Sequence, residues 1–412
     1  MSFGRWCVEL DLGVGEAVRS TLPWSGQELA RVLVRLHREP VGYVVAPCPG
    51  GAVDPVAVRT LAGELLADRI TDHLDDEGLL DPFAPPSDMC RNRRVVDRMV
   101  TVAVGTRDRP EIIARCLEHL IALDYPDLEI LVVDNAPKDA RTQNAVRGFT
   151  ERDPRVRYLR EDRAGVSYAR NRALAEARGA VICYTDDDVA VDEGWVDGLL
   201  RGFRLVPDAG CVTGLVCTAD IATDIEAYCD ARLPLWSSRC EPEVFVLDQP
   251  GADALYPFSV GIFGTGASFA FDVALLRQIG GFDPVLGAGT ITRGGEDLDL
   301  FLRVLYAHRP LVYMPAAVVW HSHRATHEGL MKQMFGYGSG LTALMTKVFL
   351  DKTTRGDLVR RVPRGVRRAA ANSRGTTERY TGPATPKGAL RRELTGLLAG
   401  PFLYARSLRQ HR

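Results

Sequence analysis

The sequence predicts an α/β protein with a Rossmann-like, mostly parallel sheet flanked by helices, a small α+β module before it and a basic, partly helical extension after it. Between residues 99 and 184, short apolar runs alternate with helical segments across short loops, a pattern typical of parallel sheets. A linker with three prolines (81–94) precedes this region, and the chain after residue 350 is rich in arginine. We therefore divide the chain into an N-terminal accessory module (1–95), a core domain (96–350) and a basic C-terminal extension (351–412).

The composition is that of an ordinary globular protein, with 46% apolar and 25% charged residues among 412. This excludes a disulfide-framework toxin, a collagen and a wholly disordered chain. The nine cysteines are odd in number, scattered and without a CxxC pair, which indicates reduced thiols. The N-terminus lacks the apolar core of a signal peptide, and no run of about 18 apolar residues occurs. We expect a cytoplasmic protein, either soluble or peripheral at the inner face of the membrane.

The net charge of −2 conceals two regions of opposite charge. Residues 351–412 contain 15 Lys/Arg and 4 Asp/Glu, a net charge of +11, which leaves −13 for residues 1–350. An acidic body argues against nucleic acid as a partner. The basic tail has two interpretations that stay open: contact with anionic lipid headgroups, or a solvated tail.

The expected elements of the N-terminal module are two short strands around a turn and one helical stretch. The strands cover 33–36 and 41–46, and apolar residues recur with helical spacing over 56–74. No activity follows from these elements. A docking, acceptor-orienting or dimerising role is a hypothesis, so the oligomeric state stays open.

The core domain begins with strand–helix alternation and continues less regularly. Ligands of such sheets bind at the carboxyl ends of the strands. The expected strands cover 99–104, 128–133, 156–159, 180–184, 211–216, 243–247, 268–271, 311–313 and 316–321. The expected helices cover 112–121, 139–150, 166–177, 273–279 and 298–307, with a glycine-interrupted helical stretch at 330–349 and a short apolar piece at 394–404.

Three consecutive carboxylates, Asp186, Asp187 and Asp188, follow the fourth expected strand. They repel one another unless a cation is present, and Mg²⁺ and Mn²⁺ prefer oxygen ligands. Residues i and i+2 of an extended segment point the same way, so Asp186 and Asp188 can act together while Asp187 turns aside. The alternative is a solvated acidic turn. The position at a strand end favours a metal site.

A carboxylate pair, Glu296 and Asp297, follows two glycines and opens an expected helix. Acidic residues in a first helical turn are favoured by the helix dipole alone. A carboxylate held there can also act as a general base on a hydroxyl group. We expect Asp299, two residues further on, to support the fold.

Two histidines, His321 and His323, follow the last expected strand and face one side of an extended segment. A neutral imidazole beside carboxylates suits Mn²⁺, and the alternative is a surface pair without a ligand. Separately, Gly165 precedes a helix whose N–H groups can face phosphate oxygens, with Arg170 and Asn171 on that helix. The alternative there is a charged helix face.

Taken together, these segments resemble the bacterial family 2 glycosyltransferases, which are inverting, contain a DxD motif and have the GT-A fold. The resemblance runs from about residue 100 to about residue 350. The motifs that carry it, in order, are VTVAVGTRDRP, EILVVDNAP, RAGVSYARNRAL, CYTDDDV, FGTGASFAF, IGGFDPVLGAGT, GGEDLDLFLR and VVWHSHR.

The resemblance implies a donor site. Its segment after the first strand begins the nucleotide pocket, the acid ending EILVVDN reads the base, and the helix after RAG lines the ribose and diphosphate. The loop at Gly264–Ala267 lies next to the donor sugar, and Gly280–Thr290 forms the approach to the acceptor. The implied nucleotide- and donor-binding residues are Thr106, Arg107, Arg109, Asp134, Arg170, Asn171, Asp186, Asp187 and Gly266.

The resemblance also implies the catalytic groups. Asp186, Asp188 and His321 hold Mn²⁺ or Mg²⁺, Asp297 is the base, and Glu296 shapes the acceptor site. We expect a UDP-sugar donor, with dTDP or GDP left open. The acceptor is a hydroxyl group of a glycan, a glycolipid or a specialised metabolite, so it is either lipid-linked or a small molecule.

Two other functional classes are weighed against this one. A nucleotidyltransferase that makes sugar nucleotides needs a glycine-rich, basic loop after the first strand, and residues 105–110 contain a single glycine. A catalytically silent carbohydrate-binding scaffold would not need the full acidic and histidine set.

Overall fold

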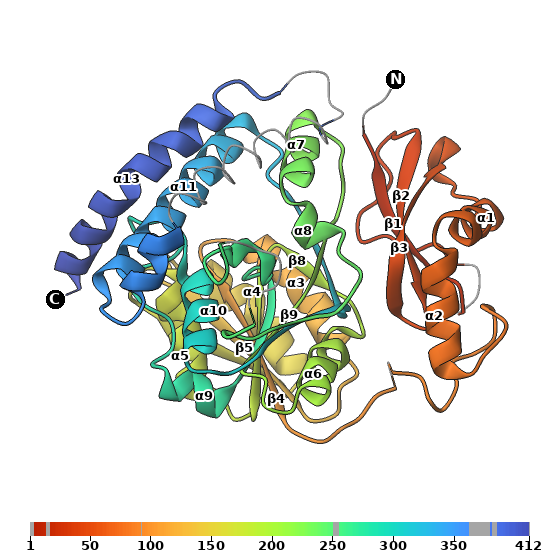
Figure 1. Cartoon of the computed structure of the whole chain (residues 1–412), viewed down its shortest axis with the longest axis horizontal. Coiled ribbons are helices and arrows are strands. Elements are labelled where there is room, and N and C mark those ends of the chain that lie inside the picture. Colours follow the sequence, from red (N-terminus) through yellow and green to blue (C-terminus); the bar gives the residue numbers. More distant parts are fainter. Residues whose placement is uncertain are drawn as a thin grey trace.

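The structure is a computed structural model that describes residues 4–13, 17–91, 93–249, 255–361, 380 and 385–411. It has the predicted mixed α/β fold, with a small three-stranded sheet beside a large central one (Figure 1). Part of the predicted basic tail (351–412) lies outside the described residues, which omit 362–379, 381–384 and 412.

The N-terminal sheet is formed by β1 (Trp6–Asp11), β2 (Leu29–Leu36) and β3 (Glu39–Pro47), and is followed by a short 3-10 helix, η1 (Pro49–Gly51). β1 pairs with β2 in parallel, and β2 pairs with β3 antiparallel. The helical stretch expected over 56–74 is two helices, α1 (Pro55–Leu65) and α2 (Ala67–Glu77). The break is at Leu66, whose backbone leaves the helical region at φ −124° and ψ 15°.

The central sheet has nine strands in the described part of the chain, in the order β10-β12-β9-β11-β7-β4-β5-β6, with β8 paired to β12. β4, β5, β6, β7, β9 and β12 run in one direction and the other three run against them, so the sheet is mostly parallel. The strands are β4 (Val100–Thr106), β5 (Leu128–Asn135), β6 (Val156–Glu161), β7 (Val181–Asp186), β8 (Val189–Val191), β9 (Cys211–Thr218), β10 (Glu243–Phe245), β11 (Ser268–Asp272) and β12 (Leu311–His321). The two extended segments expected at 311–321 are thus one strand, with a register shift between Met314 and Val318.

Helices cover both faces of this sheet, and one hydrophobic cluster fills each interface. α3 (Pro110–Ile121), α4 (Arg141–Arg152) and α6 (Trp195–Leu205) pack on one face. The other face is covered mainly by α5 (Val166–Glu176), α9 (Val273–Gln278), α10 (Glu296–Tyr306) and α11 (His327–Leu350). The remaining helices are α7 (Asp224–Arg232), α8 (Pro234–Ser237), η2 (Val260–Ile262) and α13 (Ala389–Gln410).

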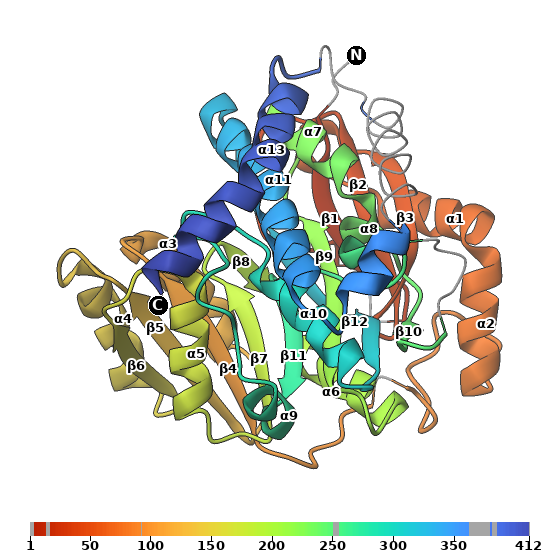
Figure 2. The same cartoon turned by 60° about the vertical axis from the view of Figure 1, so that its left-hand side comes forward.

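α11 is one uninterrupted helix, although its glycines suggested breaks. It lies side by side with α13 in both views (Figures 1 and 2). A Cβ at Gly338 would lie 2.3 Å from the carbonyl oxygen of Glu393, and one at Gly396 would lie 2.3 Å from that of Phe335. These glycines therefore allow two helix backbones to approach closely. Within the described residues, no helix is both long and apolar enough to cross a membrane.

The N-terminal sheet packs against the β9–β12 side of the central sheet. Cys7 and Leu33 share one buried cluster with Leu215, Cys217 and Trp320. Charged pairs border this contact: Arg35 Nη1 lies 2.7 Å from Asp192 Oδ2, and Arg31 Nη1 lies 2.7 Å from Asp230 Oδ1. All nine cysteines are free thiols and are buried.

Candidate active site

The acidic triplet lies where β7 ends, beside the end of β4. Thr106 Oγ1 donates a hydrogen bond to Asp187 Oδ2 at 2.7 Å, and Arg109 Nη1 lies 2.8 Å from Asp187 Oδ1. Asp187 is buried, and both of its oxygens are bound by these two side chains. It is therefore turned away from Asp186 and Asp188, as the strand alternation predicts.

Arg170, on α5, connects three segments that are distant in the sequence. Its guanidinium donates to Asp186 Oδ1 at 3.2 Å, to the carbonyl of Gly266 at 3.1 Å and to Glu296 Oε1 at 3.1 Å. The side chain is buried, and its charge is compensated by the two carboxylates. Arg170 thus fixes the end of β7, the 264–267 loop and the start of α10 relative to one another.

The carboxylate pair opens α10 as expected, after Gly295 at φ 92°. Asp297 Oδ2 accepts a hydrogen bond from the Gly266 N–H at 2.8 Å, and its Oδ1 accepts one from the Leu298 N–H at 2.8 Å. A Cβ at Gly266 would lie 3.0 Å from Asp297 Oδ2 and 3.0 Å from Arg170 Nη2, so a side chain there would push these groups apart. The pair is unequal, because Glu296 is buried and Asp297 is half-buried. Burial and the neighbouring charge of Asp297 raise the pKa of Glu296 to about 7, against the opposing effect of Arg170.

Asp188 faces the end of β12. Its Oδ1 lies 3.5 Å from His321 Nε2, and its Oδ2 lies 3.4 Å from both Arg109 Nη1 and Arg324 Nη1. Burial alone would raise the pKa of Asp188, but His321 and the two arginines outweigh it and hold that pKa well below its usual range. Desolvation raises the pKa of Asp186 to about 6, with Arg170 opposing and Asp188 adding to the shift. The two outer carboxylates therefore differ in charge environment.

The three predicted metal ligands are only partly gathered. Asp188 and His321 are in contact, while Asp186 is paired with Arg170. In the part of the chain that the structure describes, these three residues do not form a set whose ligand atoms all lie within 4.8 Å of one another. Their donor types, carboxylate oxygen and imidazole nitrogen, are nevertheless those that Mn²⁺ accepts. His323 points elsewhere, with its Nε2 3.1 Å from Thr218 Oγ1.

The predicted base-reading residue, Asp134, is fully buried at the end of β5. Its Oδ2 accepts from the Tyr158 hydroxyl at 2.8 Å, and its Oδ1 has no hydrogen-bond partner among the described residues. Buried acceptors are normally satisfied, so this oxygen lacks a donor that the described residues do not supply. Burial raises the pKa of Asp134. Tyr158 was not predicted as a site residue, and the sequence offered no signal for it.

Two predicted donor-site residues lie in other surroundings. Asn171 forms two hydrogen bonds of 2.8 Å with the backbone of Phe282, so its amide holds the loop after α9. Arg107 is exposed. Asn135, which was not predicted, holds the loop before α5: its amide donates to the Arg163 carbonyl at 2.7 Å and accepts from the Gly165 N–H at 2.8 Å. Its position next to Asp134 was the available signal.

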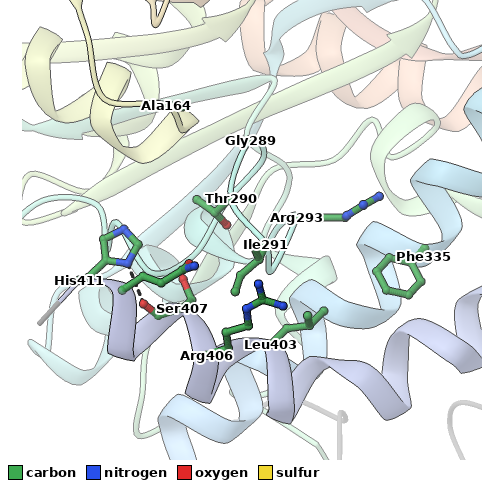
Figure 3. A pocket seen from close by; sticks show the side chains of 11 residues that line it. Ala164, Gly289, Thr290, Ile291, Arg293, Phe335, Leu403, Arg406, Ser407 and His411 are labelled. Carbon is green, nitrogen blue, oxygen red and sulfur yellow. Dashed lines mark hydrogen bonds between the residues drawn. The ribbon is translucent and has the colours of Figure 1, made fainter.

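A pocket of about 440 Å³ lies between the 289–293 loop and α13 (Figure 3). Gly289 and Thr290 line it, at the end of the segment predicted to form the approach to the acceptor. Arg293 and Arg406 contribute two cationic side chains to the lining. The pocket therefore suits a ligand with anionic or hydroxyl groups.

Part of the core domain is similar to a known protein family. Residues 101–227 match the model of "Glycosyl transferase family 2". This segment, 127 of the 412 residues, is therefore similar to the family 2 glycosyltransferases. The matched segment carries the acidic triplet and Arg170, whereas Gly266, Glu296, Asp297 and His321 lie beyond it. Arg170 joins the two parts through Asp186 and Glu296.

Several named proteins are similar to this chain. Glycosyltransferase GlyA of Streptococcus pneumoniae serotype 4 is 30% identical over 107 residues, which cover 26% of this chain and 15% of GlyA. The pre-mycofactocin glycosyltransferase of Mycobacterium tuberculosis is 28% identical over 189 residues, which cover 46% of this chain and 36% of that protein. The chain thus spans well under half the length of these relatives. A solved structure of the mannosyltransferase PcManGT from Pyrobaculum calidifontis, in complex with GDP-Man and Mn²⁺, is 20% identical with a TM-score of 0.46, covering 85% of this chain and 95% of that one.

Proposed function

We propose that this protein is an inverting, metal-dependent glycosyltransferase that moves a sugar from a nucleotide-sugar donor to a hydroxyl acceptor. The observation that supports it most is the bridge made by Arg170, which binds Glu296 through Nη1 and Asp186 through Nη2 of one guanidinium. The bridge sets the acidic triplet against the start of α10, where Asp297 lies. A site for a diphosphate and a base for an acceptor are thereby side by side.

The donor nucleotide is proposed to lie along the ends of β4 and β5. The unpaired Oδ1 of Asp134 suits the imino N–H of a uracil or thymine ring, which is a hydrogen-bond donor. We therefore propose UDP as the nucleotide of the donor, with dTDP as the second candidate. GDP is the third candidate, and all three are compared in the assay described below. Thr106 and Arg109 shape the neighbouring wall by fixing Asp187.

Asp186, Asp188 and His321 are the residues that would hold Mn²⁺ or Mg²⁺. Burial raises the pKa of Asp186, the charge of Asp188 adds to the shift, and a bound cation would offset both effects. A bound divalent cation offsets the charge of a departing nucleoside diphosphate. Asp186 would have to turn from Arg170 to join the other two, since it is paired with that guanidinium here.

Asp297 is the proposed base. The N–H groups of Gly266 and Leu298 hold its carboxylate in place, and the side chain stays half-buried rather than sealed. It accepts the acceptor's hydroxyl proton while that oxygen attacks the anomeric carbon, and a single displacement inverts the configuration. Glu296 is buried and bound to Arg170, so it positions the start of α10 and shapes the acceptor side.

The test compares Asp297→Asn with Asp208→Asn, a matched change at an exposed carboxylate. Nucleoside diphosphate release is measured with UDP-, dTDP- and GDP-sugars, Mn²⁺ and a panel of hydroxyl acceptors. We expect Asp297→Asn to lose about 10²-fold or more in turnover and to keep donor binding in a thermal-shift assay, and Asp208→Asn to be unchanged. Near-normal turnover of Asp297→Asn would reject the base. Release of pyrophosphate from a nucleoside triphosphate would favour the nucleotidyltransferase alternative, and no turnover of any donor would favour a silent scaffold.

We also propose that α13 rests on an anionic lipid surface at the inner face of the membrane, which would suit a lipid-linked acceptor. Four apolar side chains at four-residue intervals are exposed along it, with exposed fractions of 49% (Leu390), 50% (Leu394), 77% (Leu398) and 79% (Phe402). Together with the net charge of +11 over 351–412, they form an amphipathic surface.

This proposal is tested by co-sedimentation with phosphatidylglycerol and phosphatidylcholine vesicles. We expect binding to the anionic vesicles, loss of binding in Leu398→Glu, and no change in Leu80→Glu, a matched change at a leucine that is 99% exposed in another part of the chain. Equal binding of wild type and Leu398→Glu would contradict the lipid surface. If the protein instead self-associates without binding vesicles, and Leu398→Glu abolishes this self-association, the exposed apolar residues of α13 would be a contact with a second copy of this chain.

A further inference from the structure

A cluster of metal-ligating side chains lies in the N-terminal module, away from the candidate active site. His37 is in the turn between β2 and β3, and His73 and Glu77 are on α2. The side chains of His37 and Glu77 are 0% exposed, and that of His73 is 4% exposed. Cys90, in the linker after α2, is also buried. The ligand atoms of His37, Glu77 and Cys90 all lie within 4.8 Å of one another, the one such set among the described residues.

The hydrogen bonding of His37 decides which of its nitrogens faces the cluster. Nε2 lies 2.9 Å from the carbonyl oxygen of Ala84, and a carbonyl can only accept, so Nε2 carries a proton. In a neutral ring, Nδ1 then carries a lone pair. Metal-ligating histidines characteristically donate their other N–H to such an acceptor, which fixes the tautomer.

Nitrogen and oxygen atoms converge at the centre of the cluster. His37 Nδ1 lies 3.1 Å from His73 Nε2 and 3.1 Å from Glu77 Oε2. Glu77 Oε2 also accepts a hydrogen bond from the Ser87 N–H at 3.0 Å, whereas Glu77 Oε1 lies 3.0 Å from His73 Nε2 and is buried without a hydrogen bond in the described part of the chain. These buried acceptors need a cation between them, which is either a proton on an imidazole or a metal ion. In tetrahedral zinc sites, where Zn–N is about 2.0 Å and Zn–S about 2.3 Å, neighbouring ligand atoms are about 3.3–3.8 Å apart.

We propose that His37, Glu77 and Cys90 bind one structural Zn²⁺ ion and that His73, which lies outside this gathered set but 3.1 Å from His37 and 3.0 Å from Glu77, supplies the fourth ligand. Imidazole, carboxylate and thiolate are the three ligand types of protein zinc sites, and four buried ligands without an open position are the mark of a structural rather than a catalytic site. Binding converts the Cys90 thiol to a thiolate and releases one proton.

The position of the site indicates what the ion does. Cys90 belongs to the proline-rich linker between the N-terminal module and the glycosyltransferase domain. Arg91 pairs with Asp76 of α2, and Arg94 Nε lies 3.0 Å from Asp197 Oδ2 on α6. The zinc ion would tie the linker to α2 four residues before the linker reaches the central domain. It would therefore fix the orientation of the module at its junction.

The test uses the full chain, purified without a histidine tag. Metal content is measured by mass spectrometry, and Co²⁺ is then substituted to record the thiolate-to-metal charge-transfer band. We expect one zinc ion per chain and a charge-transfer band with Co²⁺. Cys90→Ser should lose the band, whereas Cys116→Ser should keep it. Cys116 is the matched control because it is buried beside the acidic triplet, with its Sγ 3.7 Å from the Asp186 carbonyl.

The wild-type measurements decide the proposal even if Cys90→Ser fails to fold. Protein that contains no zinc and takes up neither Zn²⁺ nor Co²⁺ would overturn it, and would leave an imidazolium–carboxylate pair at His37 and Glu77. A charge-transfer band that disappears in Cys116→Ser rather than Cys90→Ser would move the metal to the active site and equally overturn it. Removal of zinc with 1,10-phenanthroline should lower the melting temperature of wild type, and added Zn²⁺ should restore it.

Discussion

The cluster around Arg170 and the cluster around His37 are both groups of ionisable side chains, and they are built in opposite ways. In the first, carboxylates are held by guanidinium groups, and the Asp186 side chain keeps 40% of its surface exposed. In the second, Glu77 pairs with two imidazoles, and the His37, His73 and Glu77 side chains are 0–4% exposed. An open site with hard oxygen ligands can exchange a cation and admit a substrate, whereas a closed site with nitrogen and sulfur ligands retains its ion.

Selective chelation should separate the two clusters, and we expect it to produce the largest effect. EDTA applied briefly should abolish sugar transfer, because the proposed ligands at the active site are only partly buried and would exchange Mn²⁺ or Mg²⁺ readily. Added Mn²⁺ or Mg²⁺ should restore transfer, while zinc content stays at one ion per chain. Turnover and metal content are measured on the same sample. Full activity without a divalent cation would reject the metal role of the triplet.

Arg170→Lys should give the next largest effect, because lysine keeps the charge but has a single nitrogen in place of the two guanidinium nitrogens that bind Glu296 and Asp186. We expect kcat/KM to fall about 10–10²-fold, since small displacements of reacting groups cost that much. Arg172→Lys, two residues along the same helix on a more exposed side chain, is the control. The zinc content should be the same in both variants. Equal kinetics in the two would mean that the bridge does not organise the site.

The sequence was sufficient to predict the main sheet and the acidic residues at its edge. Short apolar strands ending in Asp134 and Asp186 place these acids at one edge of a parallel sheet, and the structure has them there. The Arg170 bridge could not be predicted, because Arg170 and Glu296 are 126 residues apart and no local pattern records their contact. Arg170 was expected to line the ribose and diphosphate, which stays a prediction, and in the structure its guanidinium binds the two acids.

The packing of α11 and the cluster around His37 could not be predicted from the local sequence. Glycines inside a helix usually indicate a break, as we expected for α11. In the structure they allow α13 to approach α11 closely, and the residues of α13 that they contact are about 60 positions away in the sequence. Likewise, His37, His73 and Cys90 are scattered without the spacing of a zinc motif, so only folding brings them together. The local pattern of apolar residues therefore predicted the helices and strands. It could not predict the side-chain contacts between helices and strands that are distant in the sequence.

Glu296→Gln tests the environment of the bridge through pH. Burial raises the folded-state pKa of Glu296 to about 7, above its ordinary value near 4.5. Its protonated form therefore contributes stability that is fully present below about pH 4.5 and is lost as the pH rises through about 7. We expect the free energy of unfolding of Glu296→Gln, relative to wild type, to increase over this range by on the order of 1–3 kcal/mol. Denaturant titrations of metal-free protein measure it. The control is Glu118→Gln, at an exposed carboxylate on α3, whose free energy of unfolding should depend on pH as that of wild type does. The same pH dependence for Glu296→Gln and wild type would contradict the raised pKa of Glu296.

The smallest expected effect concerns the link between the N-terminal module and the proposed metal ligand His321. Arg31 pairs with Asp230, which accepts a hydrogen bond from Thr218 Oγ1 at 2.6 Å, and Thr218 lies 3.1 Å from His323. Thr218→Val removes the hydroxyl from this chain while keeping the side-chain volume, so the segment that carries His321 loses a lateral support. We expect about tenfold or less weakening of Mn²⁺ activation at unchanged saturating turnover, the pattern of a positioning residue. Thr60→Val, on the exposed side of α1, is the control. A loss of turnover at saturating Mn²⁺ would place Thr218 in the chemistry itself. An unchanged activation curve would mean that the N-terminal module contacts the central sheet without influencing its open site.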